Sequence, residues 1–92
     1  MWHVYIIRCR DGTLYTGSTT DIDRRLKEHN AKKGGNYTRL RTPVKFRYSE
    51  THKNRSDAQK REAQIKGWSR QKKLALIQCS VKMLHKLSVS HD

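Results

Sequence analysis

One carboxylate falls where an apolar side chain would be expected. Ala58, Glu62 and Ile65 follow one another at spacings of four and three, so a helix would place all three on one face. A lone carboxylate on a buried face is costly unless it pairs with a cation or binds a metal ion. The alternative is an exposed Glu62–Lys66 pair, which contributes about a few tenths of a kcal/mol. The spacing alone supports both interpretations equally.

Arg25 and His29 lie four residues apart in another helical segment, where both would flank the apolar positions Ile22 and Leu26. A guanidinium there can bind a phosphate, and an imidazole can transfer a proton. The plainer alternatives are one more cation in a basic run, and a histidine favoured by the helix dipole. Without further information these plainer alternatives are favoured, and composition does not separate Arg24 from Arg25.

Tyr5 and Tyr15 lie on the two arms of a predicted hairpin, whose register decides whether they share a face. A two-residue turn at Asp11-Gly12 sends them to opposite faces. A three-residue loop with Gly12 left-handed in a bulge pairs Tyr5 with Gly17 and places both phenols on one face. Gly17 has no Cβ and would then leave the backbone beside Tyr5 open to close approach.

The elements that position these residues are marked by alternation, helix caps and glycines. The predicted strands are residues 3–8, 13–18 and 44–51, the last with Val44, Phe46 and Tyr48 on its buried face. We expect Phe46 to pack in the core rather than serve as a platform for base stacking. Three helices are predicted: one from Thr20 or Asp21 to about Lys33, ended by Gly34-Gly35; one from the capping box Ser56–Gln59 to near Gly67; and one capped by Ser69.

The element order is β-β-α-β-α-α, with no periodic signal in residues 36–43. It predicts an α+β fold in which a small, mostly antiparallel three-stranded sheet is flanked by three helices. We expect one domain over residues 1–79 and a C-terminal extension over 80–92 that is partly helical or frayed.

The charge of the chain favours nucleic acid as a partner. Its 92 residues carry 21 Lys and Arg against 8 Asp and Glu, a formal net charge of +13. Residues 24–73 hold 17 of these cations and only 4 acids. Solubility alone needs a charge of only about 2–8 for a small domain. A positive surface that attracts a polyanion is the better explanation.

Other classes of protein fit the sequence poorly. No apolar run approaches the roughly 20 residues that cross a bilayer, and the first residues lack the pattern of a signal peptide. We therefore expect no membrane association and a cytoplasmic location. Cys9 and Cys79 are expected to be reduced thiols rather than metal ligands.

The chain resembles the GIY-YIG nuclease superfamily, specifically its small single-domain bacterial branch, related to the nuclease module of structure-specific resolving enzymes. The resemblance covers about residues 2–77. It rests on His3-Val4-Tyr5, Tyr15-Thr16-Gly17, residues 18–30, Tyr37-Thr38, Tyr48-Ser49-Glu50 and residues 61–66. Two departures are His3, in place of the first glycine of the signature, and Ser18, where the excision-repair incision subunits have a lysine. We expect no counterpart of the zinc-binding domain that follows in the eukaryotic resolving enzymes.

The resemblance implies roles for particular residues. The catalytic set would be Tyr5, Tyr15, Arg25, His29 and Glu62, with Glu62 holding one Mg²⁺ or Mn²⁺. Tyr5 is the preferred general base, because a cation and Arg25 should lower its pKa, and His29 is the alternative. The expected nucleic-acid contacts are Gly17, Ser18, Lys32, Lys33, Asn36, Tyr37, Arg39, Arg41 and Lys66.

The sequence thus predicts a metal-dependent DNA endonuclease that acts in DNA repair or recombination, with RNA as a further candidate substrate. Two alternatives are kept. One is a basic nucleic-acid-binding module without catalysis, which leaves Glu62 on an inward face unexplained. The other is a nuclease subunit that needs an unidentified protein partner.

Overall fold

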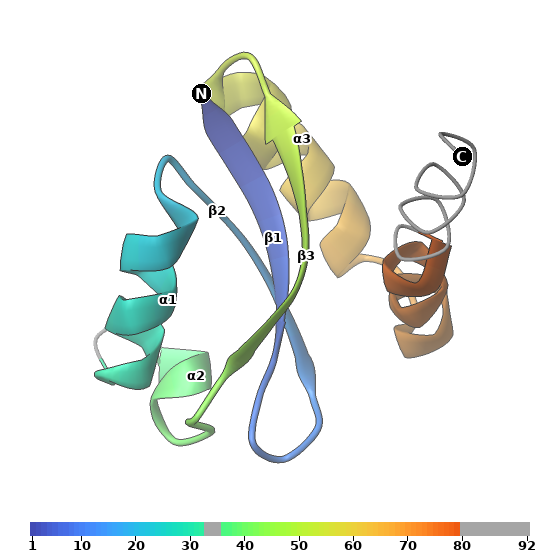
Figure 1. Ribbon diagram of the computed structural model, residues 1–92. Helices are drawn as coiled ribbons and strands as arrows, with labels where there is room; N and C mark the ends of the chain where they lie inside the picture. Colours follow the sequence, from blue (N-terminus) through green and yellow to red (C-terminus); the bar gives the residue numbers. More distant parts are fainter. Residues whose placement is uncertain (33–35, 80–92) are drawn as a thin grey trace, which may run out of the picture.

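The computed structural model describes residues 1–32 and 36–79, with the side chains at positions 36 and 37 outside that description. At its centre is an antiparallel sheet in the strand order β2-β1-β3, made of β1 (Trp2–Arg8), β2 (Leu14–Thr19) and β3 (Lys45–His52). Helices α1 (Ile22–Asn30) and α3 (Arg55–Lys66) lie on opposite sides of the sheet (Figure 1). A further helix covers residues 70–79. The predicted α+β fold is confirmed, and the one-turn α2 (Asn36–Arg39) adds an element where none was predicted.

The hairpin between β1 and β2 adopts the three-residue loop. The amide of Cys9 donates to the carbonyl of Thr13 at 2.8 Å, and the amide of Gly12 donates to the carbonyl of Cys9 at 2.9 Å. Gly12 has a φ of 87°, the left-handed conformation that this bulged loop requires. Tyr5 consequently pairs with Gly17 and Ile7 with Tyr15, so the two phenols share a face of the sheet.

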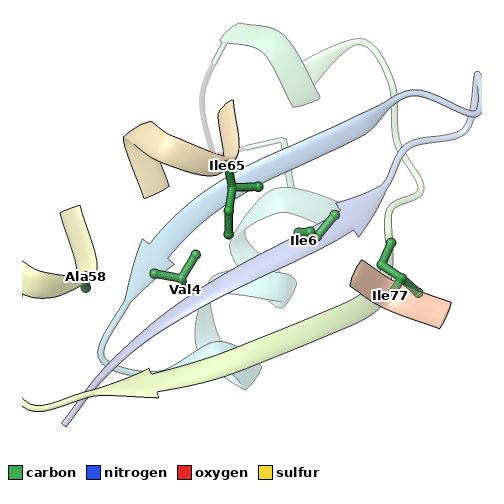
Figure 2. Close-up of a cluster of buried hydrophobic side chains, with 5 residues drawn as sticks. All are labelled: Val4, Ile6, Ala58, Ile65 and Ile77. Carbon is green, nitrogen blue, oxygen red and sulfur yellow. The ribbon is translucent and has the colours of Figure 1, made fainter. Parts of the chain in front are cut away.

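Each face of the sheet carries its own small core. Figure 2 shows Val4 and Ile6 of β1 with Ala58 and Ile65 of α3, and with Ile77 from the helix at 70–79. The opposite face buries Tyr5, Ile7, Cys9 and Val44, with Tyr15 and Leu26 of α1 packed against them. Alternate residues of β1 therefore serve the α3 face and the α1 face.

The pairing between β1 and β3 contains a bulge that overturns one prediction. Ile6 pairs with Tyr48 but Ile7 pairs with Phe46, which leaves Arg47 as an extra residue. Val44 packs on the α1 face while Tyr48 packs on the α3 face, so the predicted common face for Val44, Phe46 and Tyr48 is wrong. Phe46 is 45% exposed, and its assignment to the core is also wrong.

The ends of α1 also differ in part from the prediction. Asp21 is the N-cap as expected, with its Oδ1 accepting from the amide of Arg24 at 3.0 Å. The helix ends at Asn30, however, before the predicted Lys33 and the two glycines. Lys32 takes a left-handed φ of 64°, and its amide donates to the carbonyl of His29 at 3.0 Å. Asn30 Oδ1 accepts from the amide of Val44 at 2.7 Å, which ties this end of α1 to the start of β3.

Helix α3 begins earlier than the predicted capping box at Ser56. Its N-cap is Asn54, whose Oδ1 accepts from the amide of Asp57 at 2.9 Å. Asparagine caps a helix as well as serine does, so the position of the turn after β3 decided between them. Gly67 is the C-cap, as predicted. Ser69 Oγ accepts from the amide of Lys72 at 3.2 Å, which supports its predicted capping of the next helix.

The predicted C-terminal extension over 80–92 lies outside the described residues. Within residues 1–32 and 36–79, each helix is too short or too polar to cross a bilayer.

Candidate active site

A chain of polar groups is buried between α1, α2 and the sheet. Tyr5 Oη lies 2.9 Å from Nε2 of His29, and Nδ1 of the same imidazole lies 2.8 Å from Oγ1 of Thr38. All three side chains are nearly or fully removed from solvent. Both ring nitrogens of His29 are therefore engaged, one toward β1 and the other toward α2.

The ring of Tyr5 lies directly against Gly17 of β2. A Cβ on Gly17 would come within 2.5 Å of Tyr5 Oη and 2.6 Å of Cζ, far closer than two such atoms can approach. The close approach that Gly17 permits is thus taken by Tyr5 itself, so the expected opening beside Tyr5 is filled. Because Gly17 has no Cβ, the Tyr5 phenol can occupy this position against β2.

Tyr15 joins the same group from β2. Its ring centroid lies 5.5 Å from that of His29 at an interplanar angle of 67°, an edge-on arrangement. Lys66 of α3 places Nζ 5.8 Å from the centroid of the same ring. Tyr15 therefore stands between the His29 side and the α3 side of the sheet.

Glu62 approaches β2 from the α3 side. Its Oε1 accepts a hydrogen bond of 2.6 Å from the Ser18 hydroxyl, and its Oε2 lies 2.6 Å from Nζ of Lys66. The Glu62 side chain is 19% exposed and that of Lys66 is 48% exposed. The two interpretations of the sequence are thus combined: Glu62 faces the sheet and also pairs with Lys66.

These groups meet around the edge of the sheet, because β2 is an outer strand. Gly17 and Ser18 are neighbours in β2, so they face opposite sides. Gly17 faces Tyr5, and Ser18 faces Glu62. The candidate site therefore straddles the β2 edge, with the phenols and imidazole on the α1 side and the carboxylate on the α3 side.

Arg25 is the better placed of the two adjacent arginines of α1. Its side chain is 28% exposed, whereas that of Arg24 is 63% exposed. Arg25 Nη1 lies 3.8 Å from Oε1 of Glu28, a long ion pair. Its guanidinium also acts on the pKa of Tyr5 and of His29, which places its charge beside the buried polar chain.

The environment keeps Tyr5 and His29 uncharged. Burial raises the pKa of Tyr5 above its ordinary value, although a hydrogen bond and the charge of Arg25 oppose this. Arg25 lowers that pKa as expected, but in the protein without a bound ion desolvation is the larger effect. Burial, followed by the charge of Arg25, lowers the pKa of His29. The imidazole is consequently a neutral acceptor near physiological pH.

Glu62 has the chemistry of a site for one hard cation. Within residues 1–32 and 36–79, no three His, Cys, Asp or Glu side chains gather closely enough to enclose a metal ion. Glu62 and the Ser18 hydroxyl form a pair of oxygen donors. Mg²⁺ and Mn²⁺ accept one or two carboxylates and take further ligands from water and phosphate. The donors present fit such an ion, and they do not fit a zinc site.

The other expected nucleic-acid contacts lie on more than one surface. Ser18 and Lys66 belong to the cluster at the β2 edge. Lys32, just past α1, and Arg39 of α2 are exposed to solvent. Lys33 and the side chains of Asn36 and Tyr37 lie outside the described residues.

Arg41 lies at the hairpin loop rather than with the Glu62 cluster. Its Nε is 3.1 Å from Oδ2 of Asp11, and its carbonyl accepts from the amide of Arg10 at 2.7 Å. Arg41 thus links the segment after α2 to the β1–β2 loop.

Sequence reasoning missed Thr38. It lies in the one-turn α2, in a stretch without periodicity, and only contact in space connects it to His29. Its place in the Tyr37-Thr38 motif was the signal present in the sequence, but a threonine in a polar segment has no distinctive pattern.

A second missed group fixes α3 against β3. Arg61 Nε donates to both oxygens of Glu50, at 3.2 and 3.0 Å, and its guanidinium lies 5.1 Å from the Trp68 ring centroid. The Tyr48 hydroxyl donates to Glu50 at 2.7 Å, and His52 Nε2 lies 2.6 Å from the same carboxylate. Burial, and then the bond to Glu50, raises the pKa of Tyr48 to about 12. Because Arg61 precedes Glu62, this contact fixes the direction in which Glu62 projects.

Comparison with known proteins finds a family match over most of the chain. The GIY-YIG catalytic domain matches residues 1–75. A UPF0213 protein of Halobacterium salinarum is 55% identical over 76 residues, which cover 83% of this chain and 99% of that protein. A UPF0213 protein of Desulfotalea psychrophila is 54% identical over 82 residues, 88% of this chain and 74% of its own.

Solved structures agree with this match. The solution NMR structure of a UPF0213 protein from Bacillus halodurans has a TM-score of 0.56 and 41% sequence identity, and it covers 86% of this chain and 85% of its own. A second NMR structure, of a protein from E. faecalis, has a TM-score of 0.55 and 39% identity, with coverages of 90% and 84%.

Proposed function

The chain belongs to the GIY-YIG family of nuclease domains, and from that premise we propose that it is a DNA endonuclease that hydrolyses phosphodiester bonds with one bound Mg²⁺ or Mn²⁺. The observation that carries the proposal is the meeting, at the β2 edge, of a neutral proton chain with a half-buried carboxylate. Hydrolysis of a phosphodiester needs both a proton acceptor and a site for positive charge.

The proton acceptor is His29, acting through Tyr5. A phenol with a raised pKa is not ionised at neutral pH, so Tyr5 cannot act as a base unaided. Its hydroxyl lies 2.9 Å from Nε2 of a neutral imidazole. As the attacking water passes a proton to Tyr5 Oη, the phenol proton moves to His29 Nε2. The Nδ1–H of His29 then donates to Thr38, which stabilises the imidazolium that forms.

Arg25 and Glu62 are the residues proposed to stabilise the negative charge of the phosphate. The Arg25 guanidinium offers a fork of donors to the non-bridging oxygens, a geometry that lysine does not reproduce. Glu62 would hold the divalent ion, and GIY-YIG nucleases generally use such ions. The ion would supply positive charge to stabilise the negative charge that develops on the phosphate. Ser18 and Lys66 orient the carboxylate, and the half-exposed Lys66 can turn from Glu62 toward a phosphate.

The proposed catalytic unit is residues 1–79, and DNA is the proposed partner. The net charge of +13 supports affinity for a polyanion. We assign the activity to DNA repair or recombination in the cytoplasm, since both processes create strands that must be cut.

The decisive test is cleavage of duplex, flap and branched DNA with Mg²⁺ or Mn²⁺. We expect Glu62→Gln to lower the cleavage rate about 1000-fold, because the amide lacks the charge that holds the ion. DNA affinity of this variant, measured by gel shift, should stay close to that of the parent. Asp23→Asn is the matched control, since Asp23 is an exposed acid in the first turn of α1.

Two results would contradict the proposal. Equal cleavage by the parent and Glu62→Gln would exclude the carboxylate from catalysis. Tight DNA binding by the parent without cleavage in either metal would favour the binding module instead.

A further inference from the structure

An aromatic ring is exposed among cations at the start of β3. Phe46 is 45% exposed, although it lies in a strand. Its two neighbours in β3, Lys45 and Arg47, are exposed as well. The bulge at Arg47 produces this arrangement, because it takes Phe46 out of the alternation that buries Tyr48.

A hollow with basic walls lies at the same end of β3 but toward the other face of the sheet. Arg8 pairs with Lys45 whereas Ile7 pairs with Phe46, and neighbouring residues of a strand face opposite sides. The hollow has a volume of about 330 Å³ and is lined by Arg8, Cys9, Arg10, Pro43 and Lys45. Three of these five side chains are cations, and no acid is among them. In the described part of the chain, no carboxylate lies within ion-pair distance of those cations. The nearby Asp11 pairs with Arg41 and accepts from Thr13.

These residues lie within reach of the candidate active site. Ile7 of β1 pairs with Tyr15 on one side and with Phe46 on the other. Neighbouring strands are about 4.8 Å apart, so Tyr15 and Phe46 lie about 10 Å apart across the sheet. This distance is short enough for one bound strand to reach both residues.

Arg8, Arg10, Lys45, Phe46 and Arg47 surround the β3 edge of the sheet from both faces, and we call this group the Phe46 surface. We infer that it binds an unpaired DNA strand that passes around this edge next to the site of cleavage. The cations contact the phosphates, and the Phe46 ring stacks on a base. Bases inside a duplex already stack on one another, so only an unpaired base can use the ring. A second copy of this chain is a poor occupant, because two molecules of charge +13 repel each other. The inference rests on the proposed function and narrows its substrate to DNA with a single-stranded part.

The test measures binding in a Glu62→Gln background, where cleavage plays no part. Fluorescein-labelled oligothymidine of about 16 nucleotides, the matching oligouridine and a duplex of equal length are titrated by fluorescence anisotropy. We expect Phe46→Ala to weaken oligothymidine binding about tenfold and duplex binding much less. Phe46→Trp should retain the affinity, since tryptophan also stacks.

Two matched controls separate this surface from general effects. Leu74→Ala removes another exposed apolar side chain, 40% exposed in the helix at 70–79, and should leave all affinities unchanged. Arg47→Gln should weaken oligothymidine binding and flatten its salt dependence more than Arg24→Gln, which removes an exposed cation from α1.

Equal losses for oligothymidine and duplex in Phe46→Ala would overturn the inference, as would no loss for either. Tighter binding of oligouridine than of oligothymidine would overturn the assignment to DNA. If the parent cleaves no DNA in the earlier assay, the proposed function fails, but the binding measured here is unaffected. The two proposals can therefore fail separately.

Discussion

The two sides of the β2 edge hold polar groups of opposite character. On the α1 side, Tyr5, His29 and Thr38 are 3%, 0% and 1% exposed. Their environment keeps the phenol and the imidazole neutral. On the α3 side, Glu62 and Lys66 are charged partners that remain partly open to water. Strand β2 thus separates a buried, uncharged hydrogen-bonded chain from a partly exposed ion pair.

This difference follows from the cost of burying charge. A neutral hydrogen-bonded chain can be buried at little cost, whereas an ion loses much of its hydration. Glu62 lies at the rim, where its charge is solvated and an ion or a phosphate can reach it. The buried hydrogen-bonded chain can therefore hold its groups in a fixed geometry, while Glu62 on the exposed side can exchange Lys66 for an ion.

Among changes on the α1 side of β2, Gly17→Ala should have the largest effect on cleavage. The new methyl group would overlap the Tyr5 ring, so the ring or the strand must shift, which disturbs the contact between Tyr5 and His29. We expect the cleavage rate to fall about 100-fold. The free energy of unfolding, measured with urea, should fall by about 2 kcal/mol.

Gly67→Ala is the matched control. A Cβ there meets its nearest atom, the carbonyl oxygen of Gln64, at an ordinary 3.5 Å. Its stability should change by less than about 1 kcal/mol, with unchanged cleavage. Full activity in Gly17→Ala would show that Tyr5 need not lie against β2.

A milder change is Thr38→Val, which keeps the shape but removes the partner of His29 Nδ1. The cleavage rate should fall roughly tenfold, a fraction of what a general base contributes. The acid limb of the pH–rate profile should move to lower pH, because the imidazolium loses an acceptor. Thr38→Ser should restore both properties. A lower rate with an unmoved acid limb would assign Thr38 a packing role only.

The smallest expected effect is the pH dependence of stability. The pKa of folded His29 lies below its ordinary value of 6.5, so the unfolded chain takes up the proton first. The free energy of unfolding should therefore be at its full value above pH 6.5 and fall as the pH drops below it. Urea titrations followed by tryptophan fluorescence can measure this, with His29→Gln as the comparison. An equal fall in His29→Gln would assign the effect to other groups.

A further loss is expected at lower pH from the α3 side. Burial opposes ionisation of Glu50, but bonds from Tyr48, His52 and Arg61 outweigh it and lower the pKa of this carboxyl. This contribution is complete above the ordinary value of 4.5 and falls as the pH decreases below it.

Local sequence rules predicted much of this arrangement. Helical spacing aligned Glu62 with Ala58 and Ile65, although it left an exposed pair with Lys66 equally open. Asp21, Gly67 and Ser69 mark helix ends as expected. The hairpin register remained open, because Gly12 suits both candidate turns. Its hydrogen bonds in the structure select the longer loop.

What the sequence did not predict depends on contacts across the fold. Alternation cannot reveal a one-residue bulge, so Phe46 was placed in the core. The direction of the Tyr5 pKa shift depends on how far the ring is buried relative to its distance from Arg25. Thr38 acquires its importance only because α2 brings it to His29.

The continuous pairing of β1 with β2, from His3 opposite Thr19 to Arg8 opposite Leu14, has a mechanical consequence. Strands joined without interruption offer no hinge about which the flanking helices could swing apart. If the chain cleaves DNA as proposed, a duplex that is to reach both sides of the β2 edge would therefore have to bend, because the protein would not bend toward it. Nicks, junctions and frayed ends bend at the lowest cost, so the proposed nuclease should cut DNA that contains them faster than an intact duplex.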